Sequence, residues 1–216
     1  MNPPIRAVVF DFGGVLITPI TTLLAEVAAW HDVSMVSMLD VLMGPRETST
    51  SDHPWHRAER GELATSEMQR EVVPFAEAAG LTLRGDEYQR VLSGEFTVHD
   101  AVIDRIVRLH DEGYLLGLLT NSFVEFREHL ESRIDFSMFD VVVDSSEVGM
   151  RKPERGIYEL TRAKLGLPHT ALFFLDDLGV NLKSARALGW QTLRYDDTVR
   201  VLSVLDALAA SKPERR

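Results

Sequence analysis

Carboxylate, hydroxyl and amide side chains follow several of the apolar segments in this chain. Asp11 follows the apolar run in "VVFDFGGVL", Thr120 and Asn121 follow the run in "LGLLTNS", and Asp176 and Asp177 follow the run in "LFFLDDLGVN". Two adjacent aspartates repel one another unless a cation or a hydrogen-bond donor lies near them. If these segments are neighbouring strands, their ends would bring three acids together in a site suited to a cation.

A lysine adds positive charge to this set. Lys152 lies in "EVGMRKPERGIY", directly before Pro153, which is typical of the first position of a helix. Taken singly, each residue has a common structural explanation, since an Asp or a Thr-Asn pair after a strand is usual in turns and a lone Lys is usually solvated. Their occurrence in this order, each beside a strand or a helix start, favours one shared site.

The apolar runs predict the elements that position these residues. Strands are expected at 5–10, 114–119, 139–143, 171–175 and 190–193, and helices at about 100–112, 123–132, 154–165, 180–188 and 199–209. Continuous apolar strands that alternate with helices indicate a parallel sheet covered on both faces. In such a sheet ligands bind at the carboxyl ends of the strands, which is where the acids lie.

Residues 18–98 interrupt the alternation and predict a helical cap inserted into a core made of residues 1–17 and 99–216. Helical spacing accounts for most of this stretch, with helices expected at about 65–79 and 85–92, and a long loop from Gly44 to Gly61. Four residues of that loop are candidates for substrate selection if the loop closes over the site: Trp55, His56, Arg57 and Glu59. The alternative is an exposed linker.

Composition narrows the class of protein. The chain has 216 residues, 45% of them hydrophobic, a formal net charge of −10 and no cysteine. Disulfides and thiolate metal sites are therefore excluded, and an acidic surface disfavours nucleic acid and anionic membranes as partners. The sequence has no apolar stretch of the roughly 20 residues that cross a bilayer and no signal-peptide pattern, so a cytoplasmic location is expected. No pattern predicts an oligomeric state.

The segments "DFGGVL", "LLTNS", "RKPERGIY" and "LDDLGVNLKSARALGW" resemble the haloacid dehalogenase (HAD) superfamily along essentially the whole chain. The likeness is to the subgroup with small helical caps, which includes bacterial sugar-phosphate phosphatases and the N-terminal domain of bifunctional epoxide hydrolases. It implies an α/β fold with a Rossmann-like parallel sheet and a helical cap. It also implies a magnesium-dependent phosphomonoester hydrolase acting on a small phosphorylated metabolite, for instance a sugar phosphate.

The resemblance gives the acidic residues their roles. Asp11 would be the nucleophile that forms an aspartyl-phosphate, which divides one difficult displacement into two. Asp11, Asp176, Asp177 and the main-chain carbonyl of Gly13 would hold Mg²⁺ through oxygen ligands. Asn181 would support the metal loop, with an ordinary place on a helix surface as the alternative.

The remaining roles concern the phosphoryl group. Thr120 and the Asn121 amide would donate hydrogen bonds to its oxygens, and Lys152 would balance negative charge on the nucleophile and the phosphate. Gly13 and Gly14 would let main-chain N–H groups approach the anion.

One position departs from the family pattern. Phosphatases of this family place a second Asp two residues after the nucleophile, as the general acid and base, and this chain has Gly13 there. Loss of general acid–base catalysis costs about 10²–10⁴-fold in rate. The outcome is a slow phosphatase, one that uses a good leaving group, or one whose acid comes from the cap.

Two rival functions remain: a metal-independent haloacid dehalogenase, which also lacks that Asp, and a catalytically weak protein that binds Mg²⁺ and phosphate. A phosphorelay receiver domain would carry its acidic pair after the first strand and would have no such cap.

Overall fold

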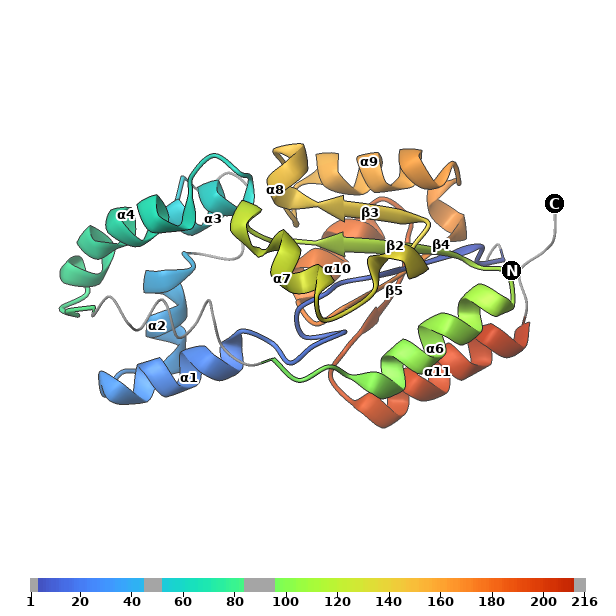
Figure 1. The fold of residues 1–216 in the computed structure, drawn as a ribbon, viewed down its shortest axis with the longest axis horizontal. Coiled ribbons are helices and arrows are strands. Elements are labelled where there is room, and N and C mark those ends of the chain that lie inside the picture. The colour runs from blue at the N-terminus through green and yellow to red at the C-terminus, as the bar shows by residue number, and fades with distance from the viewer. Residues whose placement is uncertain (1–3, 45–51, 84–95, 212–216) are drawn as a thin grey trace.

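The computed structural model describes residues 4–44, 52–83 and 96–211 (Figure 1). The helix expected at 85–92 lies outside these ranges. A five-stranded parallel sheet has the order β3-β2-β1-β4-β5. Its strands are β1 (Ala7–Phe10), β2 (Leu115–Thr120), β3 (Val141–Asp144), β4 (Leu172–Asp176) and β5 (Gln191–Arg194). The parallel sheet predicted from the apolar runs is confirmed, and each strand begins and ends within two residues of its expected bounds.

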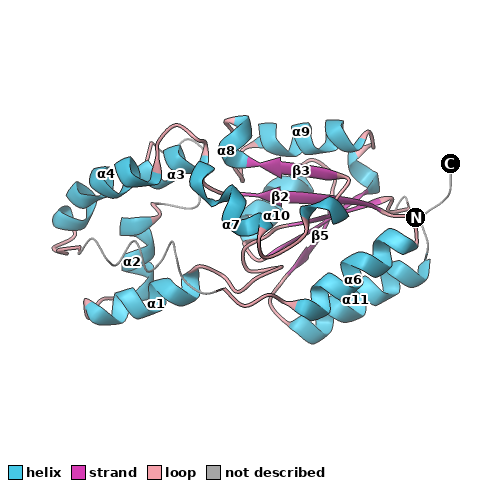
Figure 2. Ribbon diagram, in the orientation of Figure 1, coloured by secondary structure: helices cyan, strands magenta, loops and turns pink. Residues whose placement is uncertain are grey.

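Helices cover both faces of the sheet (Figure 2). The core helices are α6 (Asp100–Asp111), α7 (Arg127–Glu131), α8 (Ser145–Val148), α9 (Arg155–Leu165), α10 (Gly179–Ala187) and α11 (Thr198–Ser211). Short 3₁₀ turns lie at Val124–Phe126, Phe136–Met138 and His169–Ala171. The helix expected at 123–132 is therefore a 3₁₀ turn followed by a short α-helix.

Alternate side chains of the central strand supply the two halves of the core. Val8 and Phe10 of β1 belong to a cluster that includes residues of α6 and α11, whereas Ala7 and Val9 belong to a cluster with residues of α9 and α10. This follows from the two-residue period of a strand, which directs successive side chains to opposite faces. Because both faces are covered, β1 is apolar throughout and fully buried.

The helices between β1 and α6 form a separate group at one end of the sheet (Figure 1). Within the described residues they are α1 (Thr21–Trp30), α2 (Met35–Leu42), α3 (Pro54–Glu59) and α4 (Thr65–Ala78). Their buried side chains form a third hydrophobic cluster, to which the core loop contributes Phe123. Two chain segments connect this group to the core. They contact each other where the N–H of Thr18 donates to the carbonyl of Thr97 over 3.0 Å and where Ile17 and Val98 form an isolated β-bridge.

The expected loop at 44–61 is wrong over its second half, since residues 54–59 form helix α3. Pro54 stands at the first helical position, where its missing N–H costs nothing, and the Nδ1 atom of His53 accepts a hydrogen bond from the N–H of Trp55 over 3.2 Å. Within the described residues, no helix is both long and apolar enough to cross a membrane.

Candidate active site

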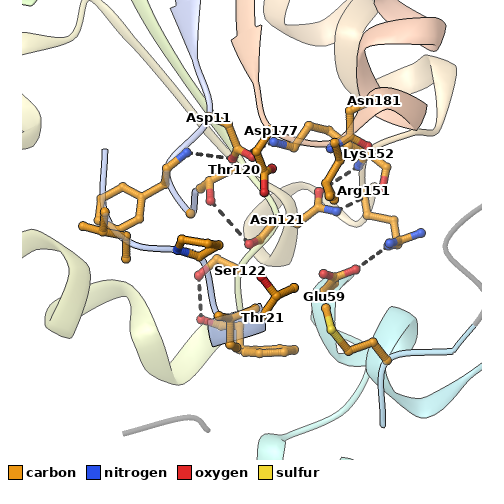
Figure 3. Close-up of a pocket in the computed structure, with 18 of the residues that line it drawn as sticks. Asp11, Thr21, Glu59, Thr120, Asn121, Ser122, Arg151, Lys152, Asp177 and Asn181 are labelled. Atoms are coloured by element: carbon orange, nitrogen blue, oxygen red, sulfur yellow. Dashed lines mark hydrogen bonds and ion pairs between the residues drawn. The ribbon is translucent and has the colours of Figure 1, made fainter. Parts of the chain in front are cut away.

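The ends of the two neighbouring strands β1 and β4 bring the acidic residues together at one edge of the sheet, and Figure 3 shows Asp11 beside Asp177 there. Asp11 follows β1, Asp176 ends β4, and Asp177 comes next in the chain. Each of the three offers a carboxylate oxygen within 4.8 Å of the others, the one such acidic cluster found among the described residues. Oxygen ligands at this density suit a hard divalent cation such as Mg²⁺.

Lys152 lies between two of these carboxylates. Its ammonium Nζ is 2.6 Å from Oδ1 of Asp11 and 2.9 Å from Oδ2 of Asp176, and the side chain is only 1% exposed. The two carboxylates raise the pKa of Lys152 against the effect of burial, so the ammonium stays protonated. Burial raises the pKa of Asp11, and the positive charge of Lys152 opposes that rise. The site therefore holds its acids beside a permanent positive charge.

Asp176 differs from Asp177 in its surroundings. The Asp176 carboxylate is fully buried and accepts four contacts, from Lys152 Nζ, from the main-chain N–H of Leu178 at 2.8 Å, and from Asn181 Nδ2 at 3.1 and 3.0 Å to its two oxygens. Asp177 is only partly buried. Asp176 thus positions the lysine and the loop that begins helix α10, and Asp177 is the more accessible of the pair. The amide of Asn181 lies on Asp176 rather than on a helix surface.

Asn121 also positions Lys152. Its side-chain Nδ2 donates to the main-chain carbonyl of Lys152 over 3.0 Å, and the main-chain N–H of Lys152 donates to its Oδ1 over 2.8 Å. The oxygen and one N–H of the side-chain amide are therefore engaged, and the main-chain N–H of Asn121 is the group that we propose for phosphate. Thr120 is 2% exposed, and its hydroxyl donates to the carbonyl of Asn121 over 3.3 Å.

The two glycines in the turn after Asp11 differ in conformation. Gly14 has φ +76°, and a Cβ there would stand 2.5 Å from Oδ2 of Asp177, so the close approach of Asp177 to this turn requires glycine. Gly13 has no left-handed φ, and a Cβ at Gly13 would meet no atom within 4 Å. The backbone at Gly13 therefore accepts a side chain, and the space beside it is open.

The site opens into a cavity of about 160 Å³ between the sheet edge and the helices α1–α4. Three of the four candidates for substrate selection line it: Trp55, His56 and Glu59. Arg57 does not, because its guanidinium turns toward Glu71, 2.6 Å away.

Arg151, which the sequence analysis missed, also lines the cavity. Its Nε donates to Oε2 of Glu59 in a buried ion pair that joins the core to helix α3 (Figure 3). Trp55 Nε1 donates to the other oxygen of Glu59 over 3.0 Å. Arg151 is adjacent to Lys152 in "RKP", but nothing in that motif distinguishes it from a solvated arginine; only its contact with Glu59, 92 residues away, does.

An open parallel sheet with a cluster of acids and a buried lysine at its carboxyl edge defines the class: an α/β protein of the doubly wound type with its site at the strand ends. The family model described as haloacid dehalogenase-like hydrolase matches residues 5–189. The chain belongs to this family, as its motifs suggested.

Curated relatives share low identity over most of the chain. Acyl-CoA dehydrogenase family member 10 of Mus musculus is 30% identical over 211 residues, which are 94% of this chain and 19% of that protein. Bifunctional epoxide hydrolase 2 of Sus scrofa is 28% identical, covering 94% of this chain and 38% of that protein. The chain thus spans well under half the length of these two relatives. Sesquiterpene phosphatase astK of Aspergillus oryzae is 24% identical, over 90% of this chain and 91% of that protein.

Two solved structures, a HAD-family enzyme with bound magnesium and phosphate and a haloacid dehalogenase, share the fold of this chain. A HAD-family enzyme of Bacteroides thetaiotaomicron, in complex with magnesium and inorganic phosphate, has a TM-score of 0.63 and 19% identity over 91% of this chain and 98% of that one. An L-2-haloacid dehalogenase has a TM-score of 0.70 and 18% identity over 94% of this chain and all of that one. At these identities the likeness establishes the fold alone.

Proposed function

We propose that this hydrolase is a magnesium-dependent phosphomonoesterase that acts on a small phosphorylated metabolite, with Asp11 as its nucleophile. One observation carries the proposal: the carboxylates of Asp11, Asp176 and Asp177 lie within 4.8 Å of one another, beside the buried Lys152. A dehalogenase displaces halide without a metal, so it has no use for this cluster. The astK phosphatase and the magnesium–phosphate complex of the Bacteroides enzyme agree with the proposal.

The residues present fit Mg²⁺, because the donors are all oxygens and two of the three carboxylates are buried where a cation offsets their repulsion. Asp11, Asp177 and the main-chain carbonyl of Gly13 would hold the ion, with Asp176 behind them. When bound, the ion supplies positive charge that reduces repulsion between the Asp11 carboxylate and an anionic phosphate.

The chain's own residues then account for the reaction. An oxygen of Asp11 attacks phosphorus, the ester P–O bond breaks, and the alkoxide departs with the bonding electron pair and takes up a proton from water. Water next attacks the aspartyl-phosphate at phosphorus and releases Asp11 and inorganic phosphate. Lys152, Thr120 and the Asn121 main-chain N–H stabilise charge on the phosphoryl oxygens.

The proposed phosphatase function also implies a division of the chain into a core and a cap. We propose that residues 18–98 form the cap and that the Ile17–Val98 bridge marks its boundary with the core. The cap rests on the core through Phe123, whose ring meets that of Trp55 edge-on at 4.8 Å, and through the Glu59–Arg151 pair. Both contacts lie at the cavity, so a cap in this position would exclude water from the reacting groups.

Haloacid dehalogenase is the second candidate, favoured by Gly13 in place of an acid. Paired assays separate the two. Phosphate release from p-nitrophenyl phosphate should require Mg²⁺, should fall at least about a hundredfold in EDTA because the carboxylate cluster then repels the substrate, and should return when Mg²⁺ is restored. Halide release from a 2-haloacid should be absent in both buffers. Halide release that is unaffected by EDTA, without phosphate release, would replace the phosphatase with the dehalogenase.

A further inference from the structure

The part of the cavity away from the carboxylates has apolar walls. Described residues of both the core and the α1–α4 helices supply them, chiefly Ile20, Met43, Trp55, Phe96, Phe123 and Phe126. The aromatic members pack against one another, with the ring of Phe123 edge-on to both Trp55 at 4.8 Å and Phe126 at 5.4 Å. Phe126 packs against the core cluster and against the cluster of α1–α4 alike, so the apolar surface is continuous across the junction.

The charged groups in these walls are paired with one another. Among the described lining residues, the charges apart from Asp11, Asp177 and Lys152 are those of Arg151 and Glu59, which form an ion pair with each side chain less than a tenth exposed. Burial and the nearby Arg151 lower the pKa of His56 to about 3, so its imidazole is neutral at physiological pH. Among the residues that the structure describes, this region therefore presents no cation without an acidic partner, and Nη1 of Arg151 is a buried guanidinium nitrogen left there without a hydrogen bond.

These walls bear on the leaving group, and the inference rests on the proposed phosphatase function. We propose that the substrate is a phosphate monoester of an apolar alcohol, whose hydrocarbon body fills the space between Ile20, Trp55 and Phe126. A sugar would bring several hydroxyls out of water onto walls in which apolar side chains predominate over the hydroxyls of Thr21 and Ser122, and each sugar hydroxyl left without a partner is costly. A hydrocarbon of similar size gains free energy in the same place. The apolar lining thus disfavours the sugar phosphate that the family resemblance suggested.

A series of primary alkyl phosphates from ethyl to hexyl tests the proposal in the presence of Mg²⁺. Burial of a methylene contributes about 0.8 kcal/mol, so kcat/KM should rise about threefold to fourfold for each added methylene until the cavity is full. Glycerol 1-phosphate should be hydrolysed at least about tenfold more slowly than propyl phosphate, which has the same carbon chain without hydroxyls. Its hydroxyls make glycerol the better leaving group, so chemistry alone predicts the opposite order.

A substitution and a binding measurement locate the effect. Ile20→Gln should flatten the dependence on chain length, because it places an amide in the apolar wall. Val124→Gln is the control, since Val124 is 58% exposed and does not line the cavity. Calorimetric titration with ethyl- to hexylphosphonate, which cannot be hydrolysed, should show affinity rising with chain length and an increasingly negative heat-capacity change.

The outcomes separate this inference from the proposed function. If alkyl phosphates are hydrolysed at rates independent of chain length, or glycerol phosphate is preferred, the apolar leaving group is wrong and the phosphatase stands. If no phosphate ester is hydrolysed but phosphonate affinity still rises with chain length, the phosphatase fails and the apolar site stands. If neither rates nor affinities respond to chain length, this inference is overturned whatever the activity. A rising series that Ile20→Gln flattens and Val124→Gln leaves intact supports it.

Discussion

Asp11→Asn is expected to lower phosphate release from p-nitrophenyl phosphate by at least about a thousandfold, because it removes the nucleophile and one carboxylate of the proposed metal site. The fold should survive the change. Burial raises the pKa of Asp11, which means that the folded protein disfavours the ionised carboxylate there, and a neutral amide of the same volume removes that cost. Steady-state assays and thermal denaturation followed by circular dichroism measure the two effects.

Asp144→Asn is the matched control. Asp144 ends strand β3, which β2 separates from β1, and is 1% exposed, so it resembles Asp11 in type, burial and place at a strand end, but it does not line the cavity. Its Oδ1 caps helix α8 by accepting from the N–H of Ser146 over 3.0 Å, a role that Asn also fills. Activity of this variant should stay within about threefold of wild type. A tenth or more of wild-type rate in Asp11→Asn would show that another residue is the nucleophile.

Gly13→Asp is expected to raise hydrolysis of alkyl phosphates relative to aryl phosphates. Alkyl leaving groups need a proton as they depart, whereas p-nitrophenolate needs little help, and general acid catalysis contributes about 10²–10⁴-fold. The backbone permits the change, because Gly13 has no left-handed φ and its Cβ would meet no atom within 4 Å. The ratio of hexyl to p-nitrophenyl phosphate rates should rise at least about tenfold in this variant.

Gly13→Asn separates proton donation from the presence of a side chain. It adds the same volume and a hydrogen-bonding amide but no acidic proton, so the alkyl-to-aryl ratio should stay near that of wild type. Should Gly13→Asn raise the ratio as much as Gly13→Asp, the effect would be one of packing. An unchanged ratio in folded Gly13→Asp would mean that the proton comes from the cap or from a bound water.

The sheet could be predicted from the sequence because its signal is local. The central strands β1, β2 and β4 are short apolar runs buried almost throughout, whereas β3 and β5 at the two edges of the sheet are less buried. The helices between the strands have their own 3.6-residue pattern. Once the order of strands and helices is known, the carboxyl-end rule places Asp11, Thr120 and Asp176 at one edge, and the structure brings them there. Asn181, one turn into helix α10, lies close enough to hydrogen-bond both oxygens of Asp176.

Features that depend on distant partners could not be predicted. In the sequence, Pro45, Pro54 and a cluster of Ser and Thr predict a loop over residues 44–61, yet His53 and Pro54 together begin helix α3. The Glu59–Arg151 pair joins residues 92 positions apart, and no local pattern indicates it. The same holds for the apolar cavity, whose walls come from segments near residues 20, 43, 55, 96 and 123.

The most direct test of the central claim, phosphoryl transfer to Asp11, is to look for the covalent intermediate. Because position 13 is a glycine and supplies no general base, hydrolysis of the aspartyl-phosphate should be slow. The intermediate should therefore accumulate when the substrate has a good leaving group, which makes its formation fast. Wild-type protein with Mg²⁺ and p-nitrophenyl phosphate is quenched in acid within the first turnover, digested, and examined by mass spectrometry. The account predicts a phosphoryl group on Asp11 and a burst of about one p-nitrophenolate per site, both absent in Asp11→Asn. Steady turnover with a phosphoryl group on a different residue, or with Asp11→Asn giving the same burst, would contradict it.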